Sequence, residues 1–198
     1  MNELEKKRII TLCGRPGSGK STASKGLAAE LGYEHFSSGD LFRAIGKEKG
    51  IDVYQTNVLA KTEASIDEMV DQRLRDIGVQ QDMVVIDSRT AWHWIPQSYK
   101  VFLDLDLAVA AKRILANMDP ERIAVEHIPE DPAKYAERLQ ARLDEEAERY
   151  DAKYSVNPYD LSNYDLVVDT EANSAAEVVE LVMRSYKEWL GEGSEHLG

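Results

Sequence analysis

The chain has 198 residues and a formal net charge of −12 at pH 7. That length is enough for one domain with a substantial core, or for a core that carries a small mobile insert. A strongly acidic chain is a poor general surface for nucleic acid or a membrane, although a pocket can still concentrate a few cations around a small anionic ligand.

The distribution of apolar residues does not indicate a membrane protein. No apolar run approaches the ~18 residues that a membrane helix needs, and the charged residues 1–8 lack the apolar stretch of a signal peptide. The single cysteine, Cys13, lies inside an apolar run, where a small buried core residue in a reducing compartment is expected. We therefore expect a cytoplasmic protein that binds neither nucleic acid nor a membrane, and the acidic charge favours a monomer.

Short apolar runs alternate with amphipathic segments along the whole chain. In chain order, the pattern predicts a buried strand at 8–13, a helix at 21–32 that Gly32 ends, a short strand at 34–38, and several helices within 40–80, the clearest at 65–78. It then predicts strands at 83–87 and 101–106, a helix at 107–118, a long charged helix at about 133–153, a strand at 164–170 and a closing helix at 174–190.

This alternation predicts an α/β fold with a parallel sheet and right-handed crossovers. Two regions do not fit it: the helical block at 40–80 and the charged segment at about 117–150, which opens with three prolines within 119–132. Both are expected to be inserts over the edge of the sheet where parallel strands end, which is where such folds bind ligands.

A glycine-rich stretch, GRPGSGKST, follows the first predicted strand. It comprises Gly14, Arg15, Pro16, Gly17, Ser18, Gly19, Lys20, Ser21 and Thr22, and it matches the G-x-x-x-x-G-K-[ST] phosphate loop between a strand and a helix. The glycines let backbone N–H groups point inward, and the helix N-terminus adds partial positive charge. Lys20 is expected to reach the β- and γ-phosphates of a nucleoside triphosphate, and Ser21 to ligate Mg²⁺.

The segment SSGDLFR, which follows the second predicted strand, is a candidate for the second substrate. Ser38 or Asp40 is placed to cap the next helix, and Arg43 lies about one turn into it. Taken alone, these residues favour ordinary helix capping and a solvated arginine over a role in binding a substrate.

The segment VVIDSRTAW follows the third predicted strand. Asp87 ends that strand beside the phosphate loop, where a carboxylate can hold Mg²⁺ directly or through water, or act as a turn residue. Arg89 offers a bidentate fork for a phosphate, or forms a surface ion pair. Trp92 and Trp94 suit either stacking on a base or packing in the core.

The segments GRPGSGKST, YEHFSSGDLFR, VVIDSR and YDLSNYDLVVDT occur in the order and spacing of nucleoside monophosphate kinases. The chain most resembles the short archaeal-type cytidylate kinases, over roughly 8–190. The resemblance implies a single kinase domain, 1–198, with the P-loop NTPase fold: a five-stranded parallel sheet flanked by helices. Its core would be about 1–39, 81–118 and 154–190, its NMP-binding insert about 40–80, and its lid about 117–150.

The resemblance also implies roles for individual residues. Ser38, Asp40, Arg43 and Arg89 would bind the monophosphate. Arg113 would contact ATP near the lid hinge. Lys20, Arg89 and Arg142 would act on the transferring phosphate, with Ser21 and Asp87 on the metal side. The lid candidates are Arg122, Arg138, Arg142 and Arg149, each of which can equally belong to a solvated helix face.

The chain departs from the family pattern in three places. The usual glutamate-glycine-arginine is Asp87-Ser88-Arg89, which shortens the carboxylate. Where the family usually has a proline after the fourth strand, this chain has Asp106. It also lacks the arginine that the family carries near Asn117.

The implied reaction moves the γ-phosphoryl of ATP, with Mg²⁺, onto CMP or dCMP. Two alternatives remain open at this point. One is adenylate kinase or another small-molecule P-loop kinase with an acceptor such as shikimate, for which Asp40 is the candidate base. The other is a non-catalytic nucleotide-binding switch. The chain lacks the metal-binding cysteines and glycine-rich lid signature common in adenylate kinases.

Overall fold

The structure, a computed structural model, describes residues 7–48, 64–118 and 128–191. Five parallel strands form one sheet: β1 (Ile9–Gly14), β2 (Glu34–Ser37), β3 (Val84–Asp87), β4 (Tyr99–Asp104) and β5 (Leu166–Asp169). Their order across the sheet is β2-β3-β1-β4-β5. The chain therefore places β2 and β3 on one side of β1 and then β4 and β5 on the other. The α/β fold with a five-stranded parallel sheet is confirmed. Such a switch beside β1 places the ligand crevice outside the carboxyl ends of the central strands.

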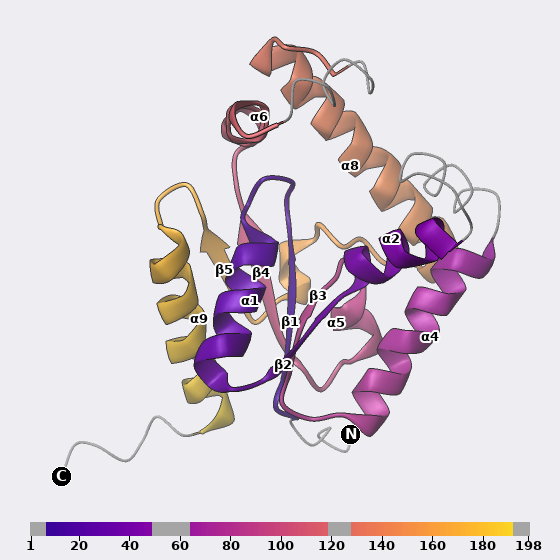
Figure 1. Cartoon of the computed structure of the whole chain (residues 1–198), viewed down its shortest axis with the longest axis vertical. Coiled ribbons are helices and arrows are strands. Elements are labelled where there is room, and N and C mark those ends of the chain that lie inside the picture. Colours follow the sequence, from indigo (N-terminus) through magenta and orange to yellow (C-terminus); the bar gives the residue numbers. More distant parts are fainter. Residues whose placement is uncertain (1–6, 49–63, 119–127, 192–198) are drawn as a thin grey trace.

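Helices cover both faces of the sheet (Figure 1). On one face lie α1 (Lys20–Leu31) and α9 (Ala175–Leu190), and on the other lie α4 (Ala64–Gln80) and α5 (Ala91–Trp94). Alternate strand residues supply the two core layers: Leu12 packs toward α1 and α9, whereas Ile86 packs toward α4 and α5. The sheet is buried on both faces, which is why its strands are continuous apolar runs.

Three helices lie over the carboxyl edge of the sheet: α2 (Ser38–Glu48), α6 (Leu107–Ala116) and α8 (Pro132–Tyr154). The short 3₁₀ helix η1 (Leu161–Asn163) leads into the amino end of β5. Leu139 and Tyr135 of α8 pack against Ala110 and Ala111 of α6. At its other end α8 reaches α4, where Lys153 Nζ lies 3.5 Å from Asp67 Oδ2. Figure 1 shows α8 running across the top of the molecule between these two contacts.

One expected boundary is corrected. The fourth strand ends at Asp104 rather than 106, because the Asp106 carboxylate accepts hydrogen bonds from the N–H groups of Ala108 (2.8 Å) and Val109 (3.2 Å) and so caps α6. The long charged helix, Pro132–Tyr154, agrees with the expected 133–153 to within one residue at each end. The expected insert and lid both include residues outside the described ranges, so that division of the chain stays a prediction.

The aromatic residues after β3 pack internally. Trp92 is buried with Cys13 and Phe102, and its indole N–H donates to the Arg89 carbonyl at 2.9 Å. Trp94 packs edge-on against Tyr154. Cys13 is a buried free thiol, as expected, and burial raises its pKa. Within the described ranges no helix combines the length and apolarity that crossing a membrane requires.

Replacing Phe102 by alanine should cost about 3–5 kcal/mol of unfolding free energy, since its fully buried ring fills the space among Cys13, Trp92 and Tyr164. The matched control is Val167→Ala. Val167 pairs with Phe102 across β4 and β5 but is 41% exposed, so the same truncation should cost less than about 1 kcal/mol. Urea unfolding measures both values, and similar losses for the two variants would contradict this packing.

Candidate functional site

The phosphate loop begins where β1 meets β4. Gly14 pairs with Leu103, and a Cβ on Gly14 would lie 2.4 Å from the Leu103 carbonyl oxygen, so no other residue fits. The Arg15 N–H donates to that same oxygen at 3.1 Å. Gly19, with φ of 79°, is the N-cap of α1 in the left-handed conformation. The two glycines therefore fix the exit from the strand and the entry into the helix.

The loop leaves several hydrogen-bonding groups free for a ligand. Gly19 has no side chain to cap α1, so the first N–H groups of that helix stay available. The Ser18 hydroxyl is buried, yet its oxygen has no hydrogen-bond partner among the described residues. Buried polar groups are nearly always satisfied, so this oxygen fits a site that gains a hydrogen-bond partner when a ligand binds. An anion at the helix N-terminus supplies such an atom.

Lys20 folds back over the loop. Its Nζ donates to the carbonyl oxygens of Gly14 at 3.1 Å and Arg15 at 3.3 Å. Burial lowers the pKa of Lys20, and the nearby positive charge of Arg89 lowers it further. A lysine in this position gains from an anion beside it, which restores the charged form.

Ser21 and Asp87 join the loop to the end of β3. The Ser21 hydroxyl donates to Asp87 Oδ2 at 3.0 Å, and the Ser38 hydroxyl donates to the Asp87 carbonyl oxygen at 3.2 Å. Mg²⁺ prefers oxygen ligands and is commonly held by one or two protein groups together with phosphates and waters. The Ser21 hydroxyl and the Asp87 carboxylate are such a pair, so these residues fit the expected magnesium ion.

The helix after β2 is capped differently from expectation. Ser37, and not Ser38 or Asp40, supplies the capping oxygen, because the Asp40 N–H donates to the Ser37 hydroxyl at 3.3 Å. Ser38 is thereby released to contact Asp87. The capping position falls on Ser37 because β2 runs directly into α2 without a loop.

A cavity of about 290 Å³ opens beside the loop. It collects polar side chains from six elements of the fold, among them Lys20, Ser38, Asp71, Arg89, Arg142 and Tyr150. Four lining residues carry positive charge, although the chain as a whole is acidic: Lys20, Arg89, Arg142 and Arg149 face three lining aspartates, Asp67, Asp71 and Asp87. The cavity therefore concentrates cations in the way that binding of a small anion requires.

A single carboxylate holds two of these arginines. Glu146 Oε2 lies 2.5 Å from Arg89 Nε, and Glu146 Oε1 accepts from Arg142 Nε at 3.0 Å. The Tyr159 hydroxyl also donates to Glu146 Oε2. Burial raises the pKa of Glu146, but Arg89 and Arg142 outweigh burial and hold that pKa at about 2. Glu146 is therefore ionised at neutral pH.

Two carboxylates of α4, one turn apart on that helix, line the cavity together with Asp87. Asp67 lies 3.8 Å from Arg149 and 3.5 Å from Lys153. Asp71 is 5% exposed, accepts from the Trp94 indole N–H at 2.9 Å, and also accepts from the Tyr154 hydroxyl. Burial raises the pKa of Asp71, while those two hydrogen bonds lower it. The cavity is thus cationic near the loop and carries carboxylates along α4.

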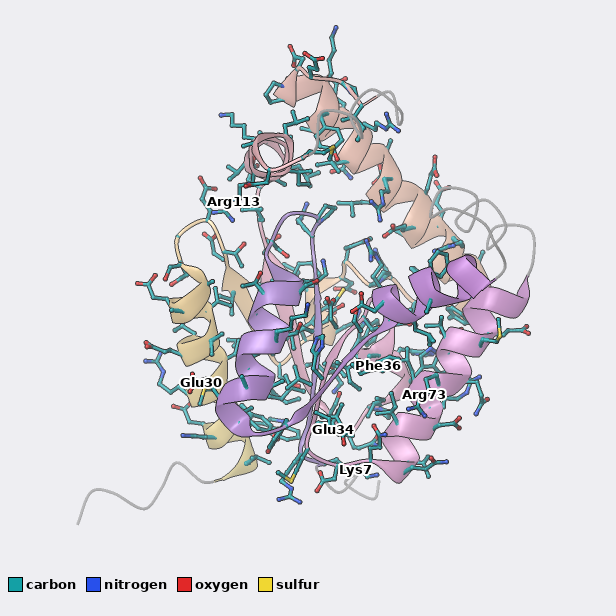
Figure 2. The ribbon with its side chains drawn as sticks, viewed as in Figure 1. Lys7, Glu30, Glu34, Phe36, Arg73 and Arg113 are labelled. Carbon is teal, nitrogen blue, oxygen red and sulfur yellow. The ribbon has the colours of Figure 1, made fainter. Side chains whose placement is uncertain are left out.

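Arg113 lies on the opposite side of the loop. It donates to the Thr170 carbonyl oxygen at 3.0 Å and lines two hollows of about 210 and 400 Å³ that also include Gly17 and Gly19. Figure 2 shows Arg113 beside α6, above the connection between β5 and α9. The loop therefore has an open space on each side, one beside Arg113 and one beside Arg89.

The structure brings together only part of the expected set. Arg142 and Arg149 line the cavity of about 290 Å³, whereas Arg138 and Asp40 are exposed and are not among its lining residues. Arg122 lies outside the described residues, as does the side chain of Arg43.

Glu146, Tyr159, Asp67 and Asp71 were not expected from the sequence. The spacing of Arg142 and Glu146 on one helix favours a pair between them, but nothing local links either residue to Arg89.

Comparisons with known proteins place this fold and site in a class. A family profile described as an AAA domain matches residues 13–150. The shikimate kinase of Bacteroides thetaiotaomicron has a similar structure, with a TM-score of 0.62 at 16% identity, covering 92% of this chain and 98% of that one. The shikimate kinase of Aquifex aeolicus has a TM-score of 0.58 at 20% identity, covering 94% and 99%. These likenesses define the fold as that of P-loop kinases.

Curated relatives define the family within that class. The cytidylate kinase of Haloarcula marismortui is 36% identical over 190 residues, covering 94% of this chain and 93% of that protein. Cytidylate kinases of Halobacterium salinarum (33% identical, covering 94% and 93%) and Methanocella arvoryzae (33%, covering 91% and 97%) are similar to the chain over comparable lengths. The chain belongs to this archaeal cytidylate kinase family.

The low pKa of Glu146 predicts a specific response to acid. Its folded-state pKa of about 2 lies below the ordinary 4.5, so the carboxylate stabilises the fold fully above about pH 4.5 and loses that effect as the pH falls toward 2. The shift corresponds to about 3 kcal/mol. Urea unfolding between about pH 7 and pH 3 should show the wild type losing more stability than Glu146→Gln. Parallel curves for the two proteins would contradict the ion pairs.

Proposed function

We propose that the protein transfers the γ-phosphoryl group of ATP to CMP or dCMP, giving ADP and CDP or dCDP. The observation that carries this proposal is the placement of Lys20, Arg89 and Arg142 around one cavity, with the phosphate loop at its edge. The relatives that match most of the chain are named cytidylate kinases, which favours a cytidine nucleotide as acceptor.

The residues suggest how such a transfer proceeds. A phosphate monoester has a second pKa of about 6, so the attacking oxygen of the acceptor is already ionised near neutral pH and needs no general base. The main difficulty is to bring two polyanions together without water. Lys20 and the two arginines neutralise and orient the phosphates, while the first N–H groups of α1 hold the triphosphate. Mg²⁺, held by Ser21 and Asp87, would add charge neutralisation between the phosphates of ATP.

The alternatives receive less support. A hydroxyl acceptor such as shikimate needs a base, but Asp40, the candidate for that role, is not among the residues that line the cavity. The likeness to shikimate kinases is at 20% identity or below and concerns the fold alone. A nucleotide-dependent switch has no need of the arginines on the acceptor side. A monomeric state and a cytoplasmic location stay predictions.

An ADP-release assay across CMP, dCMP, UMP, AMP and shikimate tests the proposal. Transfer to CMP or dCMP should exceed transfer to the other acceptors.

Lys20→Ala should lower that transfer by about 10³-fold while the protein stays folded, since it removes a cation at the developing charge. Nucleotide binding without transfer to any acceptor would instead support a switch, and near-normal activity of the lysine variant would rule out the assigned role of the loop.

The carboxylates of α4 offer a means of reading cytosine. The exocyclic amine of cytosine donates hydrogen bonds that aspartate can accept, whereas uracil presents an acceptor at the same position. A carboxylate has about four lone-pair sites, so Asp71 can keep its contacts with Trp94 and Tyr154 and still accept from a base. We therefore assign the amine-reading role to Asp71.

Asp71→Asn should lower the ratio of kcat/KM for CMP to kcat/KM for UMP by about tenfold, because the amide can donate to uracil. The matched control is Asp76→Asn on the same helix, where Asp76 accepts from Gln72 at 2.8 Å and lies outside the cavity lining. The control should leave the ratio unchanged. A drop in both activities at a constant ratio would show that Asp71 is structural only.

A further inference from the structure

Glu146 occupies an unusual place for a carboxylate, because it lies among the groups expected to bind phosphate. Its side chain is 14% exposed, and its two oxygens contact Arg89 and Arg142 separately. A carboxylate at an anion site repels the anion, so its presence there calls for a second role that offsets this repulsion. The geometry of its two contacts indicates what that contribution is.

Each of the two arginines is held by Glu146 through its own Nε atom. Arg89 and Arg142 each meet Glu146 with Nε, which belongs to one edge of the planar guanidinium. The terminal nitrogens of Arg89 and Arg142 form no hydrogen bond or ion pair within the described part of the chain. Both arginines line the cavity. A guanidinium held by Nε still presents its two terminal nitrogens, which form the fork that grips a phosphate bidentately.

Tyr159 fixes the carboxylate from a third direction. Its hydroxyl donates to Glu146 Oε2 and lies 3.2 Å from Arg89 Nε. Tyr159 follows α8 in the chain and packs with Cys13, Trp92 and Phe102 in the core. The carboxylate is therefore tied to the rigid core as well as to α8, and it cannot rotate away without breaking these contacts.

We propose that Glu146 is a positioning residue: it holds Arg89 and Arg142 by their Nε atoms so that their terminal nitrogens form one preset receptor for the phosphate that receives or transfers the γ-phosphoryl group. This inference rests on the proposed kinase function. Arg89 follows β3 and Arg142 belongs to α8, so the carboxylate is the direct link between them. Preorganised charge lowers the barrier because no side chain must be reoriented as the phosphoryl moves.

Steady-state kinetics with ATP and CMP test this role on the full-length protein. Glu146→Gln should lower kcat by about 10–100-fold, because misplacing reactive groups by about 1 Å costs a factor of that size. The KM for ATP should change by a smaller factor than kcat, since no hydrogen bond joins Glu146 to the phosphate loop within the described residues. Glu146→Asp, which keeps the charge but shortens the reach, should also lower kcat.

Two further variants separate positioning from folding. Tyr159→Phe keeps the carboxylate and both of its arginine contacts but removes the tyrosine hydrogen bond to Oε2, so it should lower kcat by a smaller factor than Glu146→Gln. Glu148→Gln, an exposed change on the same helix, is the matched control and should leave kcat unchanged. Thermal unfolding at the assay pH establishes which variants are folded, and Tyr159→Phe carries the test if Glu146→Gln is not.

The possible outcomes distinguish failure of the proposed kinase function from failure of the positioning role of Glu146. A wild-type protein that transfers phosphoryl groups to no monophosphate overturns the proposed function itself. An active wild type with unchanged or increased kcat in folded Glu146→Gln overturns only the positioning role, because the carboxylate would then act as a counterion that competes with phosphate. If Glu146→Gln is unfolded and Tyr159→Phe keeps wild-type kcat, the positioning role is likewise overturned.

Discussion

The close contact between Gly14 and the Leu103 carbonyl determines the rest of the site. Because β1 and β4 approach so closely at this point, only a glycine can end the strand there. The chain must then turn away from the sheet, and α1 begins six residues later at Lys20, whose amine returns to the Gly14 carbonyl oxygen at 3.1 Å. The end of β1 at Gly14, packed against Leu103 of β4, is therefore the point beside which the other groups of the site lie.

The sheet register brings the second half of the site to the same corner. Leu12 of β1 pairs with Asp87 of β3, and Asp87 pairs in turn with Ser37 of β2. β2 and β3 therefore end at the same level, two residues before β1 ends at Gly14, and the residues that follow them, including Ser38 and Arg89, meet beside the loop. A parallel sheet gathers side chains from distant parts of the chain in this way without any contact between them in the sequence.

The groups that could be predicted from the sequence are those whose surroundings are local. The phosphate loop needs only a strand, a run of glycines and a helix, all within about fifteen residues. The positions of Asp87 and Arg89 followed from the expected end of a strand. The capping role of Ser37 was missed because it depends on whether β2 is followed by a loop, and Asp106 was mistaken for a strand residue although it caps α6.

Other groups could not be predicted because their partners are far away in the sequence. Arg89 and Glu146 are separated by 57 positions, and Asp71 and Tyr154 by 83, so only tertiary packing brings them together. Composition also hides the character of the cavity. The chain carries a net charge of −12, yet four cationic side chains gather beside the loop, where they lie among carboxylates that pair with them.

Helix α8 acts mechanically as a lever. It is one continuous element of 23 residues, or about 34 Å, with one end seated on α6, which carries Arg113, and the other against α4, which carries Asp71. Because both contacts belong to one continuous helix, the packing of α6 and the packing of α4 are linked mechanically through α8.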